Sequence, residues 1–454
     1  MTRIGGKAIV IGASMGGLLA ARALADFYDT VTVLERDHFP VVDEPRKGVP
    51  QGRHAHGLLA RGREVIEQFF PGWTDEVVAD GGIRGDIAGD VLWVGHGVAL
   101  KTTPSDLLGL LASRPALEGH VRRRLFKLPN VRVIAGCAVQ DLVASEDRSA
   151  ILGVRVKIES APEQVMTADL VIDASGRGSL SPAWLEALGY IKPEEERIEI
   201  GIGYTTRLYR RKPSDLGGKV AIVVAGSGPN WRNGVIAYHS ADRWIVSIGG
   251  YLGDHAPVDA QMFAAYAGSL PTSEIYDIVA HAEPVSDFVS YRYPANLRRR
   301  YERLAQFPKN YLVFGDALCS FNPVYGQGMT VAAEEATLLQ RALREGTADL
   351  ARRFFGLAGV AVDTPWDIAV GNDLRHPQVQ GARPAKVRFI NWYIGKLHQA
   401  ARHDAWLAIA FLRVANLMAP PPSLLHPAII ARVIRGHLRP RNTGEAAQPT
   451  AQMS

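Results

Sequence analysis

The first residues whose types and spacing could do chemistry lie in IVIGASMGGLLAARAL, where Gly12, Ser14 and Gly17 stand at the three positions of a G-x-G-x-x-G fingerprint. Glycine at the first position permits a tight turn, and glycine at the third lets a helix pack close to the strand. The helix start then faces the charge of a pyrophosphate. Glu35 ends the second strand, where an acidic side chain accepts hydrogen bonds from a ribose. The stretch predicts a dinucleotide site, and Glu35 argues against a 2′-phosphate, which leaves NAD and FAD open.

Ser14 departs from the strict fingerprint, although a serine there can still donate a hydrogen bond near the pyrophosphate. Gly16 and Arg36, which adjoin Gly17 and Glu35, are predicted to belong to the same site.

A second glycine-rich stretch, LVFGDALCSFNPVYGQGMTVAA at 312–333, joins an apolar strand to a helix. Gly326 and Gly328 would let the backbone approach a ligand closely, but there is no Lys-Ser or Lys-Thr pair to make a P-loop. The free N–H groups of a helix start stabilise negative charge by about 0.3–1 kcal/mol. This stretch therefore indicates a close approach of the backbone to a ligand, and the residues alone leave open what the helix start holds.

The segment RHAH places two histidines at i and i+2 in a loop. It lacks the i, i+4 spacing of a helical pair and a third ligand, so the sequence predicts no metal site. Arg53, His54 and His56 either make ordinary loop hydrogen bonds or line the ligand pocket. Tyr325 is either a pocket residue or part of the core. No catalytic residue is assigned beyond these weak candidates.

The elements that position these residues begin as a βαβ unit, with strands at 7–12 and 30–37 around a helix at 16–27. Farther along, the pattern predicts helices at 58–70, 113–128, 262–270, 273–282 and 328–345, a β-meander at 130–145 and 151–159, a strand closing on a Gly-rich turn at 169–179, and a separate antiparallel sheet within 197–254. Residues 352–439 are mostly helical in pattern, and the small polar tail is predicted to be disordered.

The chain resembles the FAD-dependent monooxygenases typified by p-hydroxybenzoate hydroxylase, and within them a bacterial branch related to squalene and polyether epoxidases. Three stretches carry the resemblance over roughly residues 7–345: the fingerprint with Glu35, LVIDASGRGS at 170–179, and GDALCSFNPVYGQGMTVAAEEA at 315–336. An NAD dehydrogenase would normally continue with more βαβ repeats, whereas here a long loop follows the second strand. The resemblance therefore favours FAD.

The resemblance implies roles for the residues of the second glycine-rich stretch. Asp316 would accept a hydrogen bond from a ribityl hydroxyl of FAD. The amides around Gly326, Gln327, Gly328 and Met329 would face the pyrimidine edge of the flavin ring. Because reduced flavin is anionic at that edge, a helix start is a favourable neighbour.

Other positions match the family more loosely. Asp173 would hold the internal motif that borders FAD and the nicotinamide route, although residues 174–175 separate it from the glycine that the family places next. Arg46 and Arg114 stand where the family often places side chains that contact FAD, with a surface ion pair as the alternative. Val139 stands where a backbone contact meets adenine.

The implied fold class is α/β, with a Rossmann-like FAD-binding domain of the glutathione reductase type, an inserted antiparallel β-sheet substrate domain and a helical C-terminal region. The expected bounds are 1–190 and 291–350 for the two parts of the FAD-binding domain, 191–290 for the mainly β substrate domain, 351–440 for the helical region and 441–454 for the disordered tail.

The implied activity is that of a monooxygenase. FAD would be reduced by NAD(P)H, directly or through a separate flavin reductase, and a flavin C4a-hydroperoxide would pass one oxygen atom to a small lipophilic substrate. An alkene or a lipophilic aromatic ring is favoured, because epoxidation needs no protein base and no base for a phenol stands out. The segments GYTTRLY and VIAYHS are plausible pocket walls, and the Trp-x-Trp-x-Ile-Pro segment of the family's halogenases is not found. The alternatives are a reductase or dehydrogenase of a prenyl-like lipid and a flavin-binding protein without turnover.

The composition restricts partners and location. The chain has 454 residues with a net charge of +5, and its basic runs match no nucleic-acid motif. Cys137 and Cys319 exclude a disulfide scaffold. With no signal peptide and no spanning apolar run, we expect a cytoplasmic protein. Helices around 405–435 are basic and apolar, which is compatible either with peripheral membrane contact or with packing against the FAD-binding domain.

Overall fold

The computed structural model describes residues 3–159, 161–228 and 230–438, so the predicted tail at 441–454 lies outside the described residues. At its centre is a parallel sheet of five strands in the order β18-β12-β1-β2-β8. Its strands are short and largely apolar, as is usual in parallel sheets: Tyr311–Val313, Leu170–Asp173, Gly5–Ile11, Tyr28–Leu34 and Val131–Ile134. The predicted α/β class is confirmed.

The carboxyl ends of β1, β12 and β18 lie side by side. Ile11 pairs with Asp173, and Asp173 pairs with Val313. Consequently Gly12, which follows β1, and Phe314, which follows β18, both lie next to the end of β12. Open α/β sheets bind ligands at such an edge.

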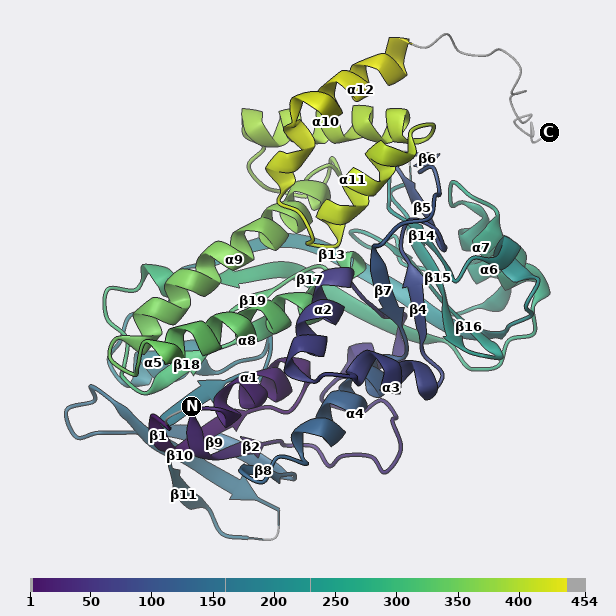
Figure 1. Ribbon diagram of the computed structural model, residues 1–454. Coiled ribbons are helices and arrows are strands. Elements are labelled where there is room, and N and C mark those ends of the chain that lie inside the picture. The colour runs from purple at the N-terminus through teal and green to yellow at the C-terminus, as the bar shows by residue number, and fades with distance from the viewer. Residues whose placement is uncertain (1–2, 160, 229, 439–454) are drawn as a thin grey trace.

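Helices pack against one face of this sheet, next to β1 and β2 (Figure 1). Helix α1 (Met15–Ala25) contacts β2, α4 (Arg114–Leu125) and α8 (Gly328–Arg344). Its many alanines let these neighbours approach closely, and Ala20, Ala21 and Ala23 have no exposed surface. Helix α1 begins just after β1, whereas α8 begins after the loop that follows β19, and residues at both helix starts line the same cavity.

A three-stranded antiparallel meander, β9 (Cys137–Ala144), β10 (Ile151–Ile158) and β11 (Gln164–Thr167), packs beside β12 and β2. The sequence predicts one meander over 130–145 and 151–159, but the structure divides the first stretch. Gly136, with φ +62°, ends the run after β8, which joins the parallel sheet, and β9 starts in a new direction.

The second large sheet has eight strands in the order β19-β17-β13-β16-β15-β14-β5-β6. Their bounds are Cys319–Ser320, Val289–Arg299, Glu195–Arg210, Arg243–Gly250, Asn233–Ser240, Ala221–Val224, Val91–Gly95 and Val98–Ala99. The sheet therefore extends the one predicted within 197–254 with strands from earlier and later in the chain. Helices α6 (Ala260–Gly268) and α7 (Glu274–His281) share a buried apolar cluster with it through Phe263 and Ile275.

Smaller elements connect the two sheets. The strands β3 (Gly57–Leu58), β7 (Leu108–Leu111) and β4 (Ile83–Asp86) form a third sheet, next to α2 (Ala60–Phe69) and α3 (Trp73–Ala79). Helix α5 (Ser181–Ala187) follows the turn after β12.

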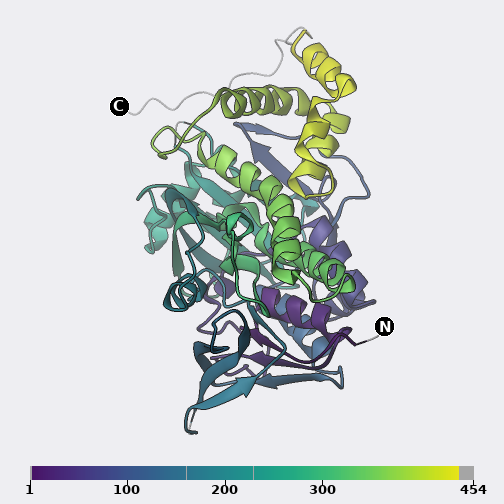
Figure 2. The ribbon, with the colours of Figure 1, turned by 90° about the vertical axis from the view of Figure 1, so that its left-hand side faces the viewer.

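The C-terminal region is helical, as predicted. Helix α9 (Leu350–Asp373) follows α8, and α10 (Ala385–Ala401), α11 (Ala405–Ala415) and α12 (Pro427–Leu438) form a separate layer at the far end from β11 (Figures 1 and 2). This layer is tied to the large sheet, because Leu397 and Leu407 share a core with Leu100, and Lys101 N–H donates to the Ala401 carbonyl at 3.0 Å. Within the described ranges, no helix combines the length and apolarity that crossing a bilayer requires.

Candidate functional site

One cavity of about 1170 Å³ extends from the edge of the parallel sheet to the C-terminal helices. Its volume exceeds the range usual for a single drug-sized ligand. Thirteen of the residues predicted for the cofactor line it: Gly12, Ser14, Gly16, Glu35, Arg36, Arg46, Arg114, Val139, Asp316, Gly326, Gln327, Gly328 and Met329. His54, His56 and Tyr325 line it as well. Residues from distant stretches of the chain thus surround a single space.

Three candidates lie away from the cavity wall. Asp173 has no exposed surface, and its carboxylate accepts hydrogen bonds from Ser175 N–H at 2.9 Å and from the hydroxyls of Ser179 and Ser181. It therefore shapes the turn after β12, and any effect on a ligand is indirect. Arg53 is exposed at the surface, and Gly17 lies behind the turn that it helps to form.

The turn between β1 and α1 leaves room only for glycine at two positions. Gly12 has φ +96°, and a Cβ there would lie 2.7 Å from the Ala174 carbonyl oxygen. A Cβ on Gly17 would lie 1.9 Å from the Gly12 carbonyl oxygen. The Ser14 hydroxyl does not cap α1, since it donates to Glu118 at 2.9 Å and accepts from Arg114 at 3.0 Å. The first N–H groups of α1 are therefore available to an anion.

Four buried charged side chains surround this helix start. Arg46 lies 2.8 Å from the Glu35 carboxylate and 3.0 Å from that of Glu118, and Arg114 lies 3.3 Å from Glu118. Burial alone would raise the pKa of Glu118, yet the guanidinium groups of Arg114 and Arg46 hold it below its usual value. Arg46 and Arg114 are thus not a surface pair: they fix the carboxylates at the cavity wall. Sequence reasoning missed Glu118, because no local pattern distinguishes it from an ordinary helix-surface glutamate.

The loop before α8 forms the opposite wall. Asp316 is open to the cavity, and burial within the surrounding protein raises the pKa of its carboxyl. Gly326 has φ +64°, and a Cβ on Gly328 would lie 3.7 Å from Asp316 Oδ1. Gln327 is 2% exposed, and its Oε1 has no hydrogen-bond partner among the described residues. Helix α8, like α1, begins without a side-chain cap.

Beneath this loop lies Glu335 of α8, which has no exposed surface. Its Oε2 accepts a hydrogen bond from Gly315 N–H at 2.7 Å, whereas its Oε1 is unpartnered in the part of the chain that the structure describes. Burial, with a smaller contribution from Asp316, raises the pKa of Glu335 to about 8. The carboxyl is therefore mostly neutral at pH 7.

We expect the free energy of unfolding to fall as the pH rises from about 4.5 to about 8, because over this range the folded protein keeps a proton on Glu335 that the unfolded chain has lost. The variant Glu335→Gln stays neutral at every pH, so it should lack this part of the pH dependence. At pH 9 it should be the more stable protein, by about 1.4 kcal/mol for each unit by which the pKa is raised. Urea unfolding of both proteins at pH 5 and pH 9 measures the difference, and identical pH dependence would contradict the assignment.

The histidines of RHAH are held inside the protein. His54 Nδ1 lies 2.7 Å from the Thr206 hydroxyl, and its ring is edge-on to Tyr204 with 4.8 Å between the ring centres. Burial lowers the pKa of His54 to about 4 and that of His56 to about 3, so both are neutral at pH 7. His54 Nε2 is covered by protein, which does not place it to take a proton from a ligand. Among the described residues, no group of three His, Cys, Asp or Glu side chains could hold a metal ion.

The other half of the cavity is apolar and aromatic. The predicted walls GYTTRLY and VIAYHS contribute Tyr204, Val235 and Ala237. Sequence reasoning did not assign the remaining lining from other strands and from the C-terminal helices, which includes Trp93, Val223, Tyr291, Tyr293, Ile390, Ile394 and Phe411. These residues meet only through long-range packing, so no spacing in the sequence could have identified them.

A buried carboxylate, Asp373 at the end of α9, holds one side of this wall. It accepts four hydrogen bonds: from the hydroxyls of Tyr251 at 2.9 Å and Tyr325 at 2.8 Å, and from the side-chain amides of Asn322 at 2.9 Å and Asn296 at 2.6 Å. Asp373 thereby joins α9, the large sheet and the loop before α8. Tyr325 lines the pocket, but its hydroxyl is committed to this network.

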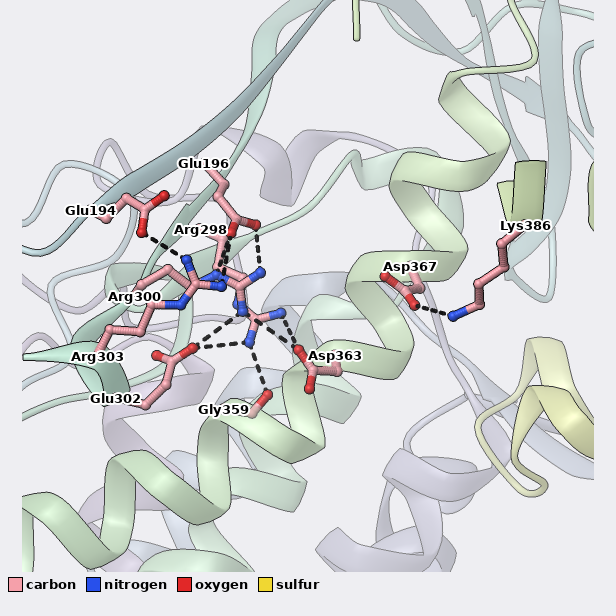
Figure 3. Close-up of polar contacts among 10 residues, drawn as sticks. All are labelled: Glu194, Glu196, Arg298, Arg300, Glu302, Arg303, Gly359, Asp363, Asp367 and Lys386. Carbon is pink, nitrogen blue, oxygen red and sulfur yellow. Dashed lines mark hydrogen bonds and ion pairs between the residues drawn. The ribbon is translucent and has the colours of Figure 1, made fainter. Parts of the chain in front are cut away.

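Two acidic residues of α9 at the cavity wall, Asp363 and Asp367, also have partners (Figure 3). Asp363 accepts from the buried Arg298 at 2.7 Å and lies 3.5 Å from Arg300, and Asp367 faces Lys386 of α10 at 3.9 Å. Arg298 also donates to the Gly359 carbonyl at 2.9 Å, which fastens α9 to β17.

Comparison with known proteins gives likenesses both in sequence and in structure. No protein-family model matches the chain. Protein Rv3254 of Mycobacterium tuberculosis is 33% identical over 456 residues, which span 95% of this chain and 94% of Rv3254.

Among solved structures, a triple variant of the flavin-dependent brominase Bmp2 has a TM-score of 0.67 at 15% identity and covers 94% of this chain and 99% of its own. PqsL of Pseudomonas aeruginosa, described as a probable FAD-dependent monooxygenase, has a TM-score of 0.61 at 18% identity and covers 84% of this chain and 99% of its own. PqsL has also been solved in complex with 2-aminobenzoylacetate. These likenesses show that the chain has the fold of flavin-dependent monooxygenases and halogenases.

Proposed function

We propose, from the premise that this chain belongs to the family of Mycobacterium tuberculosis protein Rv3254, that it is an FAD-dependent monooxygenase acting on a small lipophilic molecule. One observation carries the proposal: the uncapped starts of α1 and α8 and the carboxylates of Glu35 and Asp316 face one cavity that continues into an apolar half. The placement nearer to squalene and polyether epoxidases stays a prediction.

The residues present fit FAD. The backbone at Gly12 to Gly16 would hold the pyrophosphate, Glu35 the adenosine ribose and Asp316 the ribityl chain. The N–H groups at Gly326 to Met329 would face the polar edge of the flavin ring, where the unpartnered Gln327 oxygen also lies in the wall. FAD would supply the activation of O₂ that side chains alone provide poorly. The protein's part is to bind, to orient and to keep water from the apolar half.

The oxygen acceptor is best described as an alkene, or as a lipophilic aromatic ring that does not first need a protein base to remove a hydroxyl proton. Neutral His54 and His56 are poor bases for a phenol, and the Nε2 atom of His54 is also covered by protein. PqsL, solved with 2-aminobenzoylacetate, shows that this fold can hold a small aromatic molecule, and we extend that class of ligand to this chain. Bmp2 is a brominase, but at 15% identity its likeness concerns the fold.

Isotope labelling tests the proposed reaction. The FAD-loaded protein, supplied with ¹⁸O₂ and either NADPH or a separate flavin reductase, should place one ¹⁸O atom in at least one member of a panel of aryl alkenes and phenols. NADPH-only turnover would identify direct reduction of the flavin. Hydrogenation of an alkene without ¹⁸O would instead support the reductase alternative. If the protein cannot take up FAD, both the monooxygenase and the reductase hypotheses would be contradicted.

We also propose that the C-terminal helices contact an anionic membrane surface. Residues 385–438 contain seven Lys and Arg against one Asp, and Phe389 and Trp392 of α10 are 50% and 58% exposed. Lys386 and Ile390 of the same helix line the cavity, so this surface adjoins the substrate space. Basic and aromatic residues together favour anionic lipid interfaces. Co-sedimentation should occur with phosphatidylserine-containing vesicles and weaken in Trp392→Ser, and recovery of the protein in the supernatant with every vesicle would contradict it.

A further inference from the structure

We propose that Arg375 forms a subsite for a carboxylate group of the substrate within the apolar half of the cavity. The inference rests on the proposed function and narrows it, because the substrate class becomes an amphipathic carboxylic acid. Arg375 lies just beyond α9 and lines the cavity, with its guanidinium carbon 5.5 Å from the centre of the Trp231 ring.

The guanidinium of Arg375 lacks an acidic partner among the described residues. Among the described residues its hydrogen bond is to the Gly226 carbonyl, at a length of 3.5 Å that is the outer limit for such a bond. Enclosure by the protein lowers the pKa of Arg375, so its charge has been placed where water solvates it poorly. A cation in such a position is stabilised by an anion.

Most other charged groups of this wall have a charged partner. Arg177 also lines the cavity without an ion pair, but it donates to the Ala295 carbonyl at 2.5 Å, and its guanidinium carbon lies 4.6 Å from the centre of the Tyr293 ring. Asp363 and Asp367 face Arg298 and Lys386 (Figure 3), and Glu35 faces Arg46. Asp373 lies two residues from Arg375 in the chain, but its oxygens accept from two tyrosine hydroxyls and two asparagine amides. Arg375 therefore stands out as the cation in this half of the cavity that a ligand could neutralise.

Two neutral imidazoles border the same space. His96 and His398 line the cavity with 4.6 Å between their ring centres. Burial lowers the pKa of both imidazoles, and the nearby charge of Arg375 adds a smaller effect in the same direction. They add no negative charge to compete with a ligand. Ile394 and Phe411 lie in the lining of this region, so the group attached to the anion must be apolar.

A substrate carboxylate fits this setting better than a nicotinamide dinucleotide does. A single guanidinium matches one carboxylate in charge and in its two-pronged geometry. The phosphates of NADPH carry more negative charge than one arginine in an apolar surrounding would satisfy. A carboxylate held at Arg375 would fix which part of the substrate is presented to the flavin.

Matched acids and amides test the subsite. Isothermal titration of the FAD-loaded protein should show 4-phenylbutyrate and decanoate binding about 10- to 100-fold more tightly than 4-phenylbutanamide and decanamide. Arg375→Gln should remove this preference by weakening the acids alone, and Arg375→Lys should keep part of it. Arg388→Gln removes an exposed charge from α10 outside the cavity lining and should behave as the unaltered protein.

Equal affinity for acids and amides, including no binding of either, would overturn the subsite, as would a preference that survives Arg375→Gln. Weaker NADP⁺ binding in Arg375→Gln with unchanged acid binding would reassign the arginine to the nicotinamide cofactor. An unaltered FAD content and an unaltered unfolding midpoint show that a variant is folded. If Arg375→Gln does not fold, Arg375→Lys provides the test instead. The preference for acids over amides is measured without turnover. Its absence would therefore contradict the subsite, whereas absence of ¹⁸O incorporation would contradict the proposed monooxygenase activity, and the two results can be told apart.

Discussion

Replacing Gly17 by alanine will destabilise the fold and raise the dissociation constant for FAD about 100-fold, because the added methyl group would lie 1.9 Å from the Gly12 carbonyl oxygen. The contact is with backbone, so no rotation of a side chain can relieve it. Gly12 cannot yield easily either, since its own Cβ position is 2.7 Å from the Ala174 carbonyl at the end of β12. The start of α1 would have to move away from β1, at a cost of about 2–3 kcal/mol.

Alanine substitutions at two other glycines distinguish an effect on the stability of the fold from an effect on FAD binding. Gly356 lies in α9 with nothing within 4 Å of its Cβ position, so Gly356→Ala should be neutral or slightly stabilising. A Cβ on Gly16 would meet Phe314 at an ordinary 3.8 Å, but Gly16 lines the cavity, so Gly16→Ala should weaken FAD binding at nearly unchanged stability. Urea unfolding and titration of the apoprotein with FAD measure the two quantities. Wild-type affinity in Gly17→Ala would refute the assigned role of the turn.

The glycine-rich stretches that line one half of the cavity could be recognised in the sequence because their determinants are local. The strand, turn and helix around Gly12 and Gly17 occupy a short segment, and backbone geometry there depends on the glycines themselves. The same holds for Gly326 and Gly328 at the start of α8. The carboxyl ends of parallel strands lie at the same edge of a sheet. Asp316 and Glu35, which follow or end such strands, therefore line one cavity, although no other pattern in the sequence indicates that they lie close together.

The rest of the site depends on contacts between distant segments. Glu118 matters because Arg46, from a loop far away in the chain, lies 3.0 Å from it, and Arg375 matters because no acidic side chain meets it among the described residues. Neither property leaves a periodic pattern. Asp173 illustrates the converse: a residue inside a recognisable motif turns out to bond to Ser179 and to be absent from the cavity wall. Similarly, β8 belongs to the parallel sheet because it pairs with β2. The alternation of residues within β8 does not show which strand it pairs with.

Replacing Asp373 by asparagine should cost about 2–5 kcal/mol of stability, among the largest effects expected of any single substitution in this chain, because buried donors would lose their acceptor. Its two carboxylate oxygens accept from Tyr251, Tyr325, Asn322 and Asn296, and Asp373 has no exposed surface. An asparagine would turn its NH₂ group either toward Asn296, which meets Oδ2, or toward the three donors that meet Oδ1, of which Asn322 also has the Tyr251 hydroxyl within 3.3 Å. Each buried donor left without an acceptor costs about 1–3 kcal/mol.

The matched control lies on the same helix. Asp367→Asn removes the same charge from a side chain that is 67% exposed and whose partner, Lys386, is 3.9 Å away, so stability should change by less than about 0.5 kcal/mol. The difference between the two variants in urea unfolding, at equal dependence on denaturant, isolates the buried network from the loss of one negative charge.

Asp373→Asn should also affect FAD binding. Asn322 and Tyr325, which bond to Asp373, precede Gly326 and Gln327 in the loop before α8, which forms one wall of the cavity. Loosening that loop should weaken FAD binding, whereas Asp367→Asn should leave it unchanged. If both variants were equally stable and bound FAD equally well, the four hydrogen bonds of Asp373 would have no part in holding the wall. A loss confined to Asp373→Asn would instead mean that the end of α9, outside all three stretches that resemble the family, helps to set the geometry of the flavin site.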